Sequence, residues 1–354
     1  MNRFGVFLVA LALVSAPSVA AGADSGSMDQ SARPEGWTAA PLTKVEELPD
    51  GGKLNHYEVD GDTVVPVPPA DFSPLTASDA DLTTYGLPPG PAADADDFPA
   101  WSLDMAAWKP GPDLGLCITD LHFGSSFVRT SASTAFVPIG QDEPWSGYVA
   151  DETSNTYIAV QGDYVQKAKG ATSCSPATMG SWVGIGGYST ESLIQTGTAF
   201  TSTPTYYAWY EYIDPTHGNP AVMMPNVDVD PGEGIHVYTV HQRSTGQTTF
   251  YVYDTTDGTH QSVVKTIASS YYDGKSGEHI AEAAGGTYLG NFGNLNWTNT
   301  KVQLLSGTWV SLGSRSPTEL KSKYYYTDFN YHITADPDPM SSTTTFTDRW
   351  LRCD

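Results

Sequence analysis

The stretch SWVGIGGYSTESLIQTGTAFTSTPTYYAWYEY, residues 181–212, determines the fold class of this chain. It contains three runs of aromatic, β-branched and small residues, at 181–185, 192–199 and 205–212. Glycine, serine, threonine and proline fill the gaps between these runs. Aromatic and β-branched side chains suit a pleated surface that is half buried, and the residues in the gaps are those that form turns. The stretch therefore predicts three consecutive β-strands.

The same pattern extends on both sides of this stretch. Further strands are predicted at 156–166, 235–242, 247–254, 261–269, 278–282 and 300–310, with a single helical turn as the alternative for 278–282. The 34 glycines and 25 prolines supply turns, and the 20 tyrosines suit strands. Many short strands at regular spacing indicate a sandwich or a barrel. We expect an all-β fold in which two antiparallel sheets pack as a sandwich.

The N-terminal region differs from the rest in charge and composition. Residues 1–23 combine a basic start, a short apolar run and small residues, which predicts a signal peptide and a secreted protein outside the membrane. Residues from 24 to about 100 hold three Lys and Arg against fifteen Asp and Glu, so we expect loose order there. The predicted organisation is a signal peptide at 1–23, an acidic pro-segment or linker at 24–140, a β-sandwich at 141–335 and a C-terminal tail at 336–354.

Charge and cysteine content narrow the possible partners. The net charge of −23 argues against binding nucleic acid, because the chain could not neutralise phosphates. Cys117, Cys174 and Cys353 permit one disulfide, whose pairing the spacing leaves open. No Cys or His cluster predicts a metal or a cofactor, and we expect a monomer. The acidic loop 228–233 could bind calcium, but a solvated turn is the simpler interpretation.

Familiar catalytic motifs such as GxSxG, HExxH and the P-loop are absent from the sequence. Five segments instead gather polar and aromatic residues at predicted strand positions. They are WSGY at 145–148, WVGIGG at 182–187, LIQTG at 193–197, YYAWYEY at 206–212 and GEHIAE at 277–282, with GNFG following at 290–293. In this order and spacing they resemble the glutamic peptidase (eqolisin) family, whose pattern runs WxGY, WVGIDG, LQTG, YxAWYEW and AEWIxE. The resemblance covers about residues 143 to 310.

This resemblance implies a concanavalin-like, lectin-like jelly roll with a polypeptide substrate lying across one concave sheet. It also implies hydrolysis of peptide bonds at acid pH by a glutamine and a glutamate, without a cofactor. Gln195 matches the family's catalytic glutamine, and Glu282 matches the catalytic glutamate. Residues expected to line the substrate cleft are Trp145, Trp182, Trp209 and Glu211.

The implied pair has a coherent chemistry. Desolvation raises the pKa of a carboxyl group, which can hold it near the working pH. Ionised Glu282 would take a proton from the attacking water, while the Gln195 amide stabilises the oxyanion. Glu278 is the rival acid on the same strand face, about 13 Å from Glu282 between Cα atoms. That spacing is too long for a pair of glycosidase carboxylates, and we expect Glu278 to be a carboxylate on the sheet surface.

Two other functions stay open. One is a noncatalytic lectin-like sandwich that binds glycans or peptides in the same aromatic cleft, and the other is a polysaccharide hydrolase or lyase. The departures from the family pattern bear on this choice, because Gly186, Ala199 and Tyr207 stand where the family has acidic residues. His279 likewise replaces a tryptophan. Three lost carboxylates would change the pH dependence of the cleft, or leave a sandwich that binds without catalysis.

Overall fold

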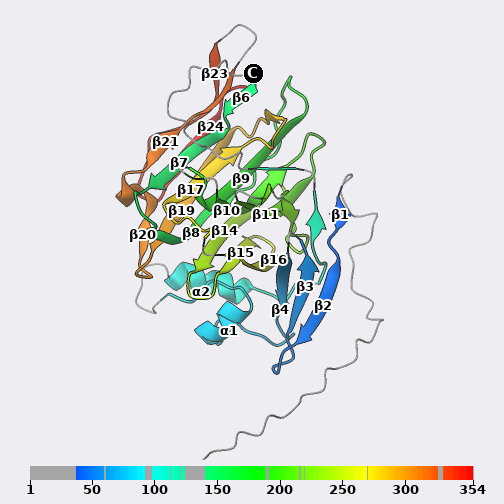
Figure 1. The fold of residues 1–354 in the computed structure, drawn as a ribbon. Helices are drawn as coiled ribbons and strands as arrows, with labels where there is room; N and C mark the ends of the chain where they lie inside the picture. The colour runs from blue at the N-terminus through cyan, green and yellow to red at the C-terminus, as the bar shows by residue number, and fades with distance from the viewer. Residues whose placement is uncertain are drawn as a thin grey trace, which may run out of the picture.

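The computed structural model describes most of the chain from Trp37 onward (Figure 1). The described residues are 37–59, 61–91, 98–111, 113–119, 121–123, 140–188, 190, 192–214, 217–218, 220–268, 270–325 and 330–353. The predicted signal peptide at 1–23 lies outside them. Among the described residues, no helix is long and apolar enough to cross a membrane.

Two large sheets make up the fold, as predicted. The first has the order β1 (Thr38–Ala39), β5 (Cys117–Ile118), β13 (Val222–Met223), β11 (Tyr206–Asp214), β10 (Leu193–Phe200), β9 (Ala177–Gly186), β17 (Ser276–Glu282), β7 (Trp145–Asp151) and β21 (Thr318–Leu320), with β12 (His217–Gly218) beside β11 and β18 (Tyr288–Leu289) beside β9. The second has the order β2 (Leu42–Glu47), β3 (Lys53–Glu58), β4 (Asp62–Val67), β16 (His260–Thr266), β15 (Gln247–Asp254), β14 (Gly234–Gln242), β8 (Tyr157–Val165), β19 (Asn294–Leu304), β24 (Phe346–Trp350), β23 (Tyr331–Pro337), β22 (Ser322–Tyr325) and β6 (Gly140–Glu143), with β20 (Trp309–Ser311) beside β19. Apart from the parallel contact of β18 with β9, the strand pairs in the described chain are antiparallel.

The main core lies between the two sheets. Ile194 and Phe200 of β10 belong to it, together with Val237 of β14 and Phe250 of β15. Tyr210 of β11 stacks on Phe250 across the layers, with ring centroids 4.8 Å apart. Because side chains alternate along a strand, the neighbours of these residues on β10 and β11 point to the opposite face of the first sheet.

Predicted and observed strands agree closely, with two differences. Residues 300–310 are not one strand, because β19 ends at Leu304 and a turn leads into β20. The stretch 278–282 belongs to strand β17, so the alternative of a helical turn is wrong.

The acidic N-terminal region is more ordered than its composition predicts. Strand β4 pairs with β16 and β5 pairs with β13, so this region adds strands to both sheets. Figure 1 shows β2, β3 and β4 in blue beside β16. Tyr57 and Val65 are buried in the main core. The expectation of loose order fails here because existing sheet edges supply hydrogen-bond partners and apolar surface that the segment lacks by itself.

Two short helices cover the outer face of the second sheet. Helix α1 (Asp79–Thr84) begins at a capping box between Ser78 and Asp81. Helix α2 (Phe98–Ala107) follows, and the 3₁₀ helix η2 (Leu312–Arg315) lies later in the chain. Leu82 of α1 packs in one cluster with Tyr238 and Tyr251 of the sheet.

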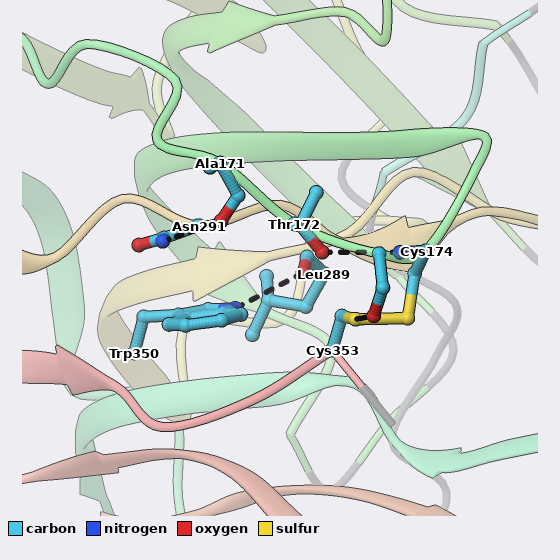
Figure 2. Close-up of a disulfide and its surroundings, with 8 residues drawn as sticks. Ala171, Thr172, Cys174, Leu289, Asn291, Trp350 and Cys353 are labelled. Carbon is cyan, nitrogen blue, oxygen red and sulfur yellow. Dashed lines mark hydrogen bonds between the residues drawn. A yellow bond between two sulfur atoms is a disulfide. The ribbon is translucent and has the colours of Figure 1, made fainter.

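A disulfide joins Cys174 to Cys353, with an S–S distance of 2.02 Å (Figure 2). Its partners are 179 positions apart in the sequence, and Cys117 is buried and is not part of this disulfide. Close by, the Trp350 indole N–H donates to the Leu289 carbonyl at 3.1 Å (Figure 2). The C-terminal residues are therefore held by β24 in the second sheet and by the disulfide.

Candidate active site

A row of polar side chains crosses the outer face of the first sheet at the level of Gln195. Gln195 on β10 lies opposite Glu211 on β11 and opposite Gly184 on β9. Gly184 in turn lies opposite Glu278 on β17. Directly opposed residues in antiparallel strands point to the same face, so Glu211, Gln195 and Glu278 share one face with Gly184 between the last two.

Gln195 and Glu211 are in direct contact. The Gln195 amide Nε2 donates to Glu211 Oε2 at 2.9 Å, and both side chains are fully buried. This bond fixes the amide so that its Oε1 remains buried without a hydrogen-bond partner among the described residues. Gln195 is thus oriented before any substrate arrives, with one polar atom still able to accept a hydrogen bond.

Glu278 faces Gln195 across Gly184. Two strand spacings put their Cα atoms about 10 Å apart, and Gly184 places no side chain in the interval. A Cβ at Gly184 would lie 2.8 Å from the Trp182 ring and 3.0 Å from Leu193, so these two side chains pack directly over the glycine.

Burial controls the acidity of Glu278. It is fully buried, and neither carboxylate oxygen has a well-formed hydrogen bond to a described residue. Burial raises the pKa of Glu278 well above its ordinary value; the Ser276 hydroxyl opposes this and the negative charge of Asp151 adds to it. The expected surface carboxylate is therefore wrong for Glu278, because the strand it occupies lies inside the sheet and its face is covered.

Glu282 lies on the same face but at a different level. It is opposite Gly180 and Trp145, and its Oε2 accepts a hydrogen bond from Trp182 Nε1 at 3.2 Å. Four residues along the strand and two strand spacings separate its Cα from that of Gln195 by about 16 Å. The pairing of Gln195 with Glu282 stays a prediction, and the register brings Glu278 to the level of Gln195. The sequence segment contains both glutamates on one face, and only the register between strands distinguishes them.

The aromatic residues expected around the site are gathered there. Trp145 and Trp182 meet edge to face with ring centroids 5.0 Å apart, and Trp209 belongs to the same buried cluster. The side chains of β11 alternate between the two faces of the sheet, since Tyr207 and Trp209 lie in this outer cluster while Tyr210 lies in the main core. The aromatic side chains thus form the walls around the glutamine and the glutamates.

A segment of the N-terminal region lies over this face. We call Cys117–Thr119 and Leu121–Phe123 the covering segment. Its strand β5 pairs with β13, and the Phe123 N–H donates to Glu211 Oε2 at 2.9 Å. The Phe123 ring stacks on Trp209 with centroids 4.4 Å apart. The sequence contains no signal for this contact, because it depends on how β5 joins the sheet.

The covering segment also sets the electrostatics of Glu211. Burial raises the pKa of Glu211 to about 7, and contacts with His122, Phe123 and Gln195 oppose this rise. His122 Nδ1 lies 3.5 Å from Glu211 Oε1. Glu211 is therefore a carboxyl group that changes charge near neutral pH while the segment is in place.

The departures from the family pattern have structural reasons. Gly186 has φ +88°, and a Cβ there would lie 2.3 Å from the Ser192 carbonyl oxygen, so an aspartate does not fit. Ala199 and Tyr207 are opposite each other, and Trp37 packs on the Tyr207 ring at 4.8 Å. His279 points away from the site, and its Nε2 lies 2.8 Å from the Gln161 carbonyl oxygen. Its replacement of tryptophan therefore leaves the site face unchanged.

Comparison with known proteins adds a family assignment. The model of the Peptidase A4 family matches residues 143–334. Scytalido-glutamic peptidase with a transition state analog inhibitor is similar at 19% identity and a TM-score of 0.49, over 60% of this chain and 100% of that one. SCP-B, a member of the Eqolisin family in complex with the tripeptide Ala-Ile-His, is similar at 20% identity and a TM-score of 0.47, with the same coverage. No curated protein matches the sequence.

Proposed function

Because the chain belongs to the Peptidase A4 family and is a hydrolase of peptide bonds, we propose that it is an acid endopeptidase in which Gln195 and Glu278 activate a water molecule. The observation that carries this proposal is the register that sets Gln195 and Glu278 at one level across Gly184. In this proposal Glu278 replaces Glu282 as the catalytic glutamate. Glu211 holds the Gln195 amide in place.

The reaction follows from the two side chains. Ionised Glu278 takes a proton from a water molecule while the water oxygen bonds to the scissile carbonyl carbon. The Gln195 amide N–H group donates to the oxyanion that forms. Protonated Glu278 then gives its proton to the leaving amine as the C–N bond breaks, which returns the carboxylate to its starting charge.

The described arrangement supports a latent form of this enzyme. The glutamine, the glutamates and the three tryptophans of the site are all fully buried, so a polypeptide cannot reach them while the covering segment is docked. Burial also raises the pKa of Glu278 and so disfavours the ionised form, which is the form that accepts a proton. Displacing the segment would admit substrate and water together, and renewed hydration would lower the pKa of Glu278 toward its ordinary value.

This latency fits the predicted pro-segment at 24–140, with the sandwich from 141 as the working domain. We further propose that the protein is exported, on the strength of residues 1–23, and that it acts as a monomer on polypeptides. The lectin-like and polysaccharide-active alternatives are not favoured, since the family is one of peptidases.

The test is digestion of a denatured protein substrate between pH 2 and 6 in the presence of pepstatin, after limited proteolysis of the N-terminal region. We expect Gln195→Ala to lower the rate by about 10²–10³-fold, the usual effect of losing one oxyanion donor. Glu278→Gln should abolish the activity because the base is lost. Both variants must retain the wild-type far-UV and near-UV circular dichroism.

The matched control is Glu282→Gln, an isosteric change on the same strand and face. We expect it to keep most of the activity, because Glu282 lies about 16 Å from Gln195. Loss of activity in Glu282→Gln with retention in Glu278→Gln would return the catalytic role to Glu282. Absence of any cleavage by the trimmed, folded wild type would refute the peptidase mechanism itself.

A further inference from the structure

Three carboxylates meet at one end of the second sheet, away from Gln195. Glu233 directly precedes β14, and Asp254 ends β15, where it lies opposite Ile235. Asp257 is in the turn that leads from β15 to β16. One oxygen from each of the three carboxylates lies within 4.8 Å of the other two. The strand register therefore brings Glu233 close to Asp254 and Asp257, which lie more than 20 positions later in the sequence.

Asp254 is buried at this position with unused hydrogen-bonding capacity. Its side chain is fully buried, and its Oδ1 accepts the backbone N–H of Thr256 at 2.7 Å. Its Oδ2 is buried and has no hydrogen-bond partner in the part of the chain that the structure describes. A buried carboxylate oxygen normally has a partner, because leaving it without one costs free energy.

The charge around the three carboxylates is uncompensated. The described residues contain no lysine, arginine or histidine that forms an ion pair with Glu233, Asp254 or Asp257. Burial and the negative charges of Asp254 and Asp257 raise the pKa of Glu233. Three mutually repelling carboxylates held this close favour a bound cation over an empty cluster.

We propose that Glu233, Asp254 and Asp257 bind a calcium ion. Calcium takes oxygen ligands at about 2.3–2.6 Å, so three oxygens within 4.8 Å of one another can all contact one ion. The cluster contains neither histidine nor cysteine, which argues against zinc. Magnesium demands a stricter octahedral geometry and retains its waters more strongly. The three carboxylates come from two loops and a strand end, and calcium accepts such an irregular set of ligands more readily than magnesium does.

This site differs from the calcium site that the sequence leaves possible in the loop 228–233, where a solvated turn is the simpler interpretation. Asp228 and Asp230 are exposed, and Asp230 contributes its backbone N–H to the Glu233 carboxylate. Only Glu233 of that loop takes part. A bound ion would join the loop before β14 to the β15–β16 turn, so its effect is on stability and not on the chemistry at Gln195.

The experiment uses the intact chain at pH 7, freed of metals by a chelator that is then removed. Titration calorimetry with calcium chloride should give one site with a Kd of about 10⁻⁴–10⁻³ M, the range of extracellular calcium modules. At about 10 mM calcium, the Tm should rise by about 2–4 °C. Magnesium at the same concentration should give a clearly smaller rise.

Two variants and a control decide the assignment. Asp257→Asn is an exposed change that leaves the fold intact, and it should weaken calcium binding at least about tenfold; Asp254→Asn should abolish it. Asp228→Asn removes a nearby exposed carboxylate outside the cluster and should bind as the wild type does. The proposal is overturned by no heat and no Tm shift with calcium, by an equal shift with magnesium, or by equal losses in Asp228→Asn and Asp257→Asn.

Discussion

The contact between Phe123 and Trp209 allows the covering of the site to be tested by one substitution. Phe123 is 1% exposed and stacks on Trp209 at 4.4 Å. Replacing a buried phenylalanine by alanine costs about 3–5 kcal/mol. If at least about 3 kcal/mol of this cost destabilises the docked state of the covering segment relative to the undocked state, the ratio of open to covered molecules rises about 10²-fold. This follows because about 1.4 kcal/mol corresponds to a factor of ten in an equilibrium constant.

The assay measures the initial rate at which freshly mixed, unprocessed chain cleaves an internally quenched peptide at pH 4. Phe123→Ala should raise this initial rate by up to about 10²-fold over the wild type. After complete proteolytic trimming, the two proteins should have the same rate, because Phe123 is then gone from both. Phe72→Ala serves as the control, since it removes an aromatic ring that packs on Tyr85 and Trp108, far from the site. Equal initial rates for Phe123→Ala and the wild type would refute the covering role.

Two further predictions concern Gly184 at the site and a buried acid in the core. Gly184→Ala should reduce activity at least about tenfold, because its Cβ would lie 2.8 Å from the Trp182 ring and displace that ring beside Gln195 and Glu278. Wild-type kcat/KM in this variant would contradict a role for Gly184 in shaping the site. Burial raises the pKa of Asp348 to about 7, so the folded state holds a proton that the unfolded state releases, and the wild-type free energy of unfolding should fall as pH rises from about 4 to 7. In Asp348→Asn this decrease in the free energy of unfolding should be smaller by up to about 3–4 kcal/mol, as measured by urea unfolding at about pH 4 and pH 7. If the free energies of unfolding of the wild type and Asp348→Asn change in parallel with pH, Asp348 is ionised in the core.

Much of the fold follows from local sequence patterns. The alternation at 205–212 places Tyr207, Trp209 and Glu211 on one face, and the structure confirms this. Gln195 likewise lies within a strand whose pattern is plain, and that strand is observed as β10. These features depend on residues within about ten positions along the chain, and the periodicity of apolar residues in the sequence reflects such local relations directly.

Features that depend on strand register could not be predicted in this way. Glu278 and Glu282 have the same periodicity, and their distances to Gln195 differ only because β17 pairs with β9 in one particular register. The pairing of Cys174 with Cys353 depends in the same manner on where the C-terminal strand lies. The order of the N-terminal region arises from sheet edges contributed by residues far along the chain, so its own composition is misleading.

The way β4 joins the second sheet has a consequence for the synthesis of the protein. Val64 pairs with Val264, so this strand emerges from the ribosome about 200 residues before its partner. At a translation rate of about 5–20 residues per second, it waits about 10–40 seconds with an unpaired edge. Acidic residues and prolines keep such a waiting strand from pairing with other chains. The acidic, proline-containing composition that suggests disorder thus protects a strand whose pairing partner is synthesised much later.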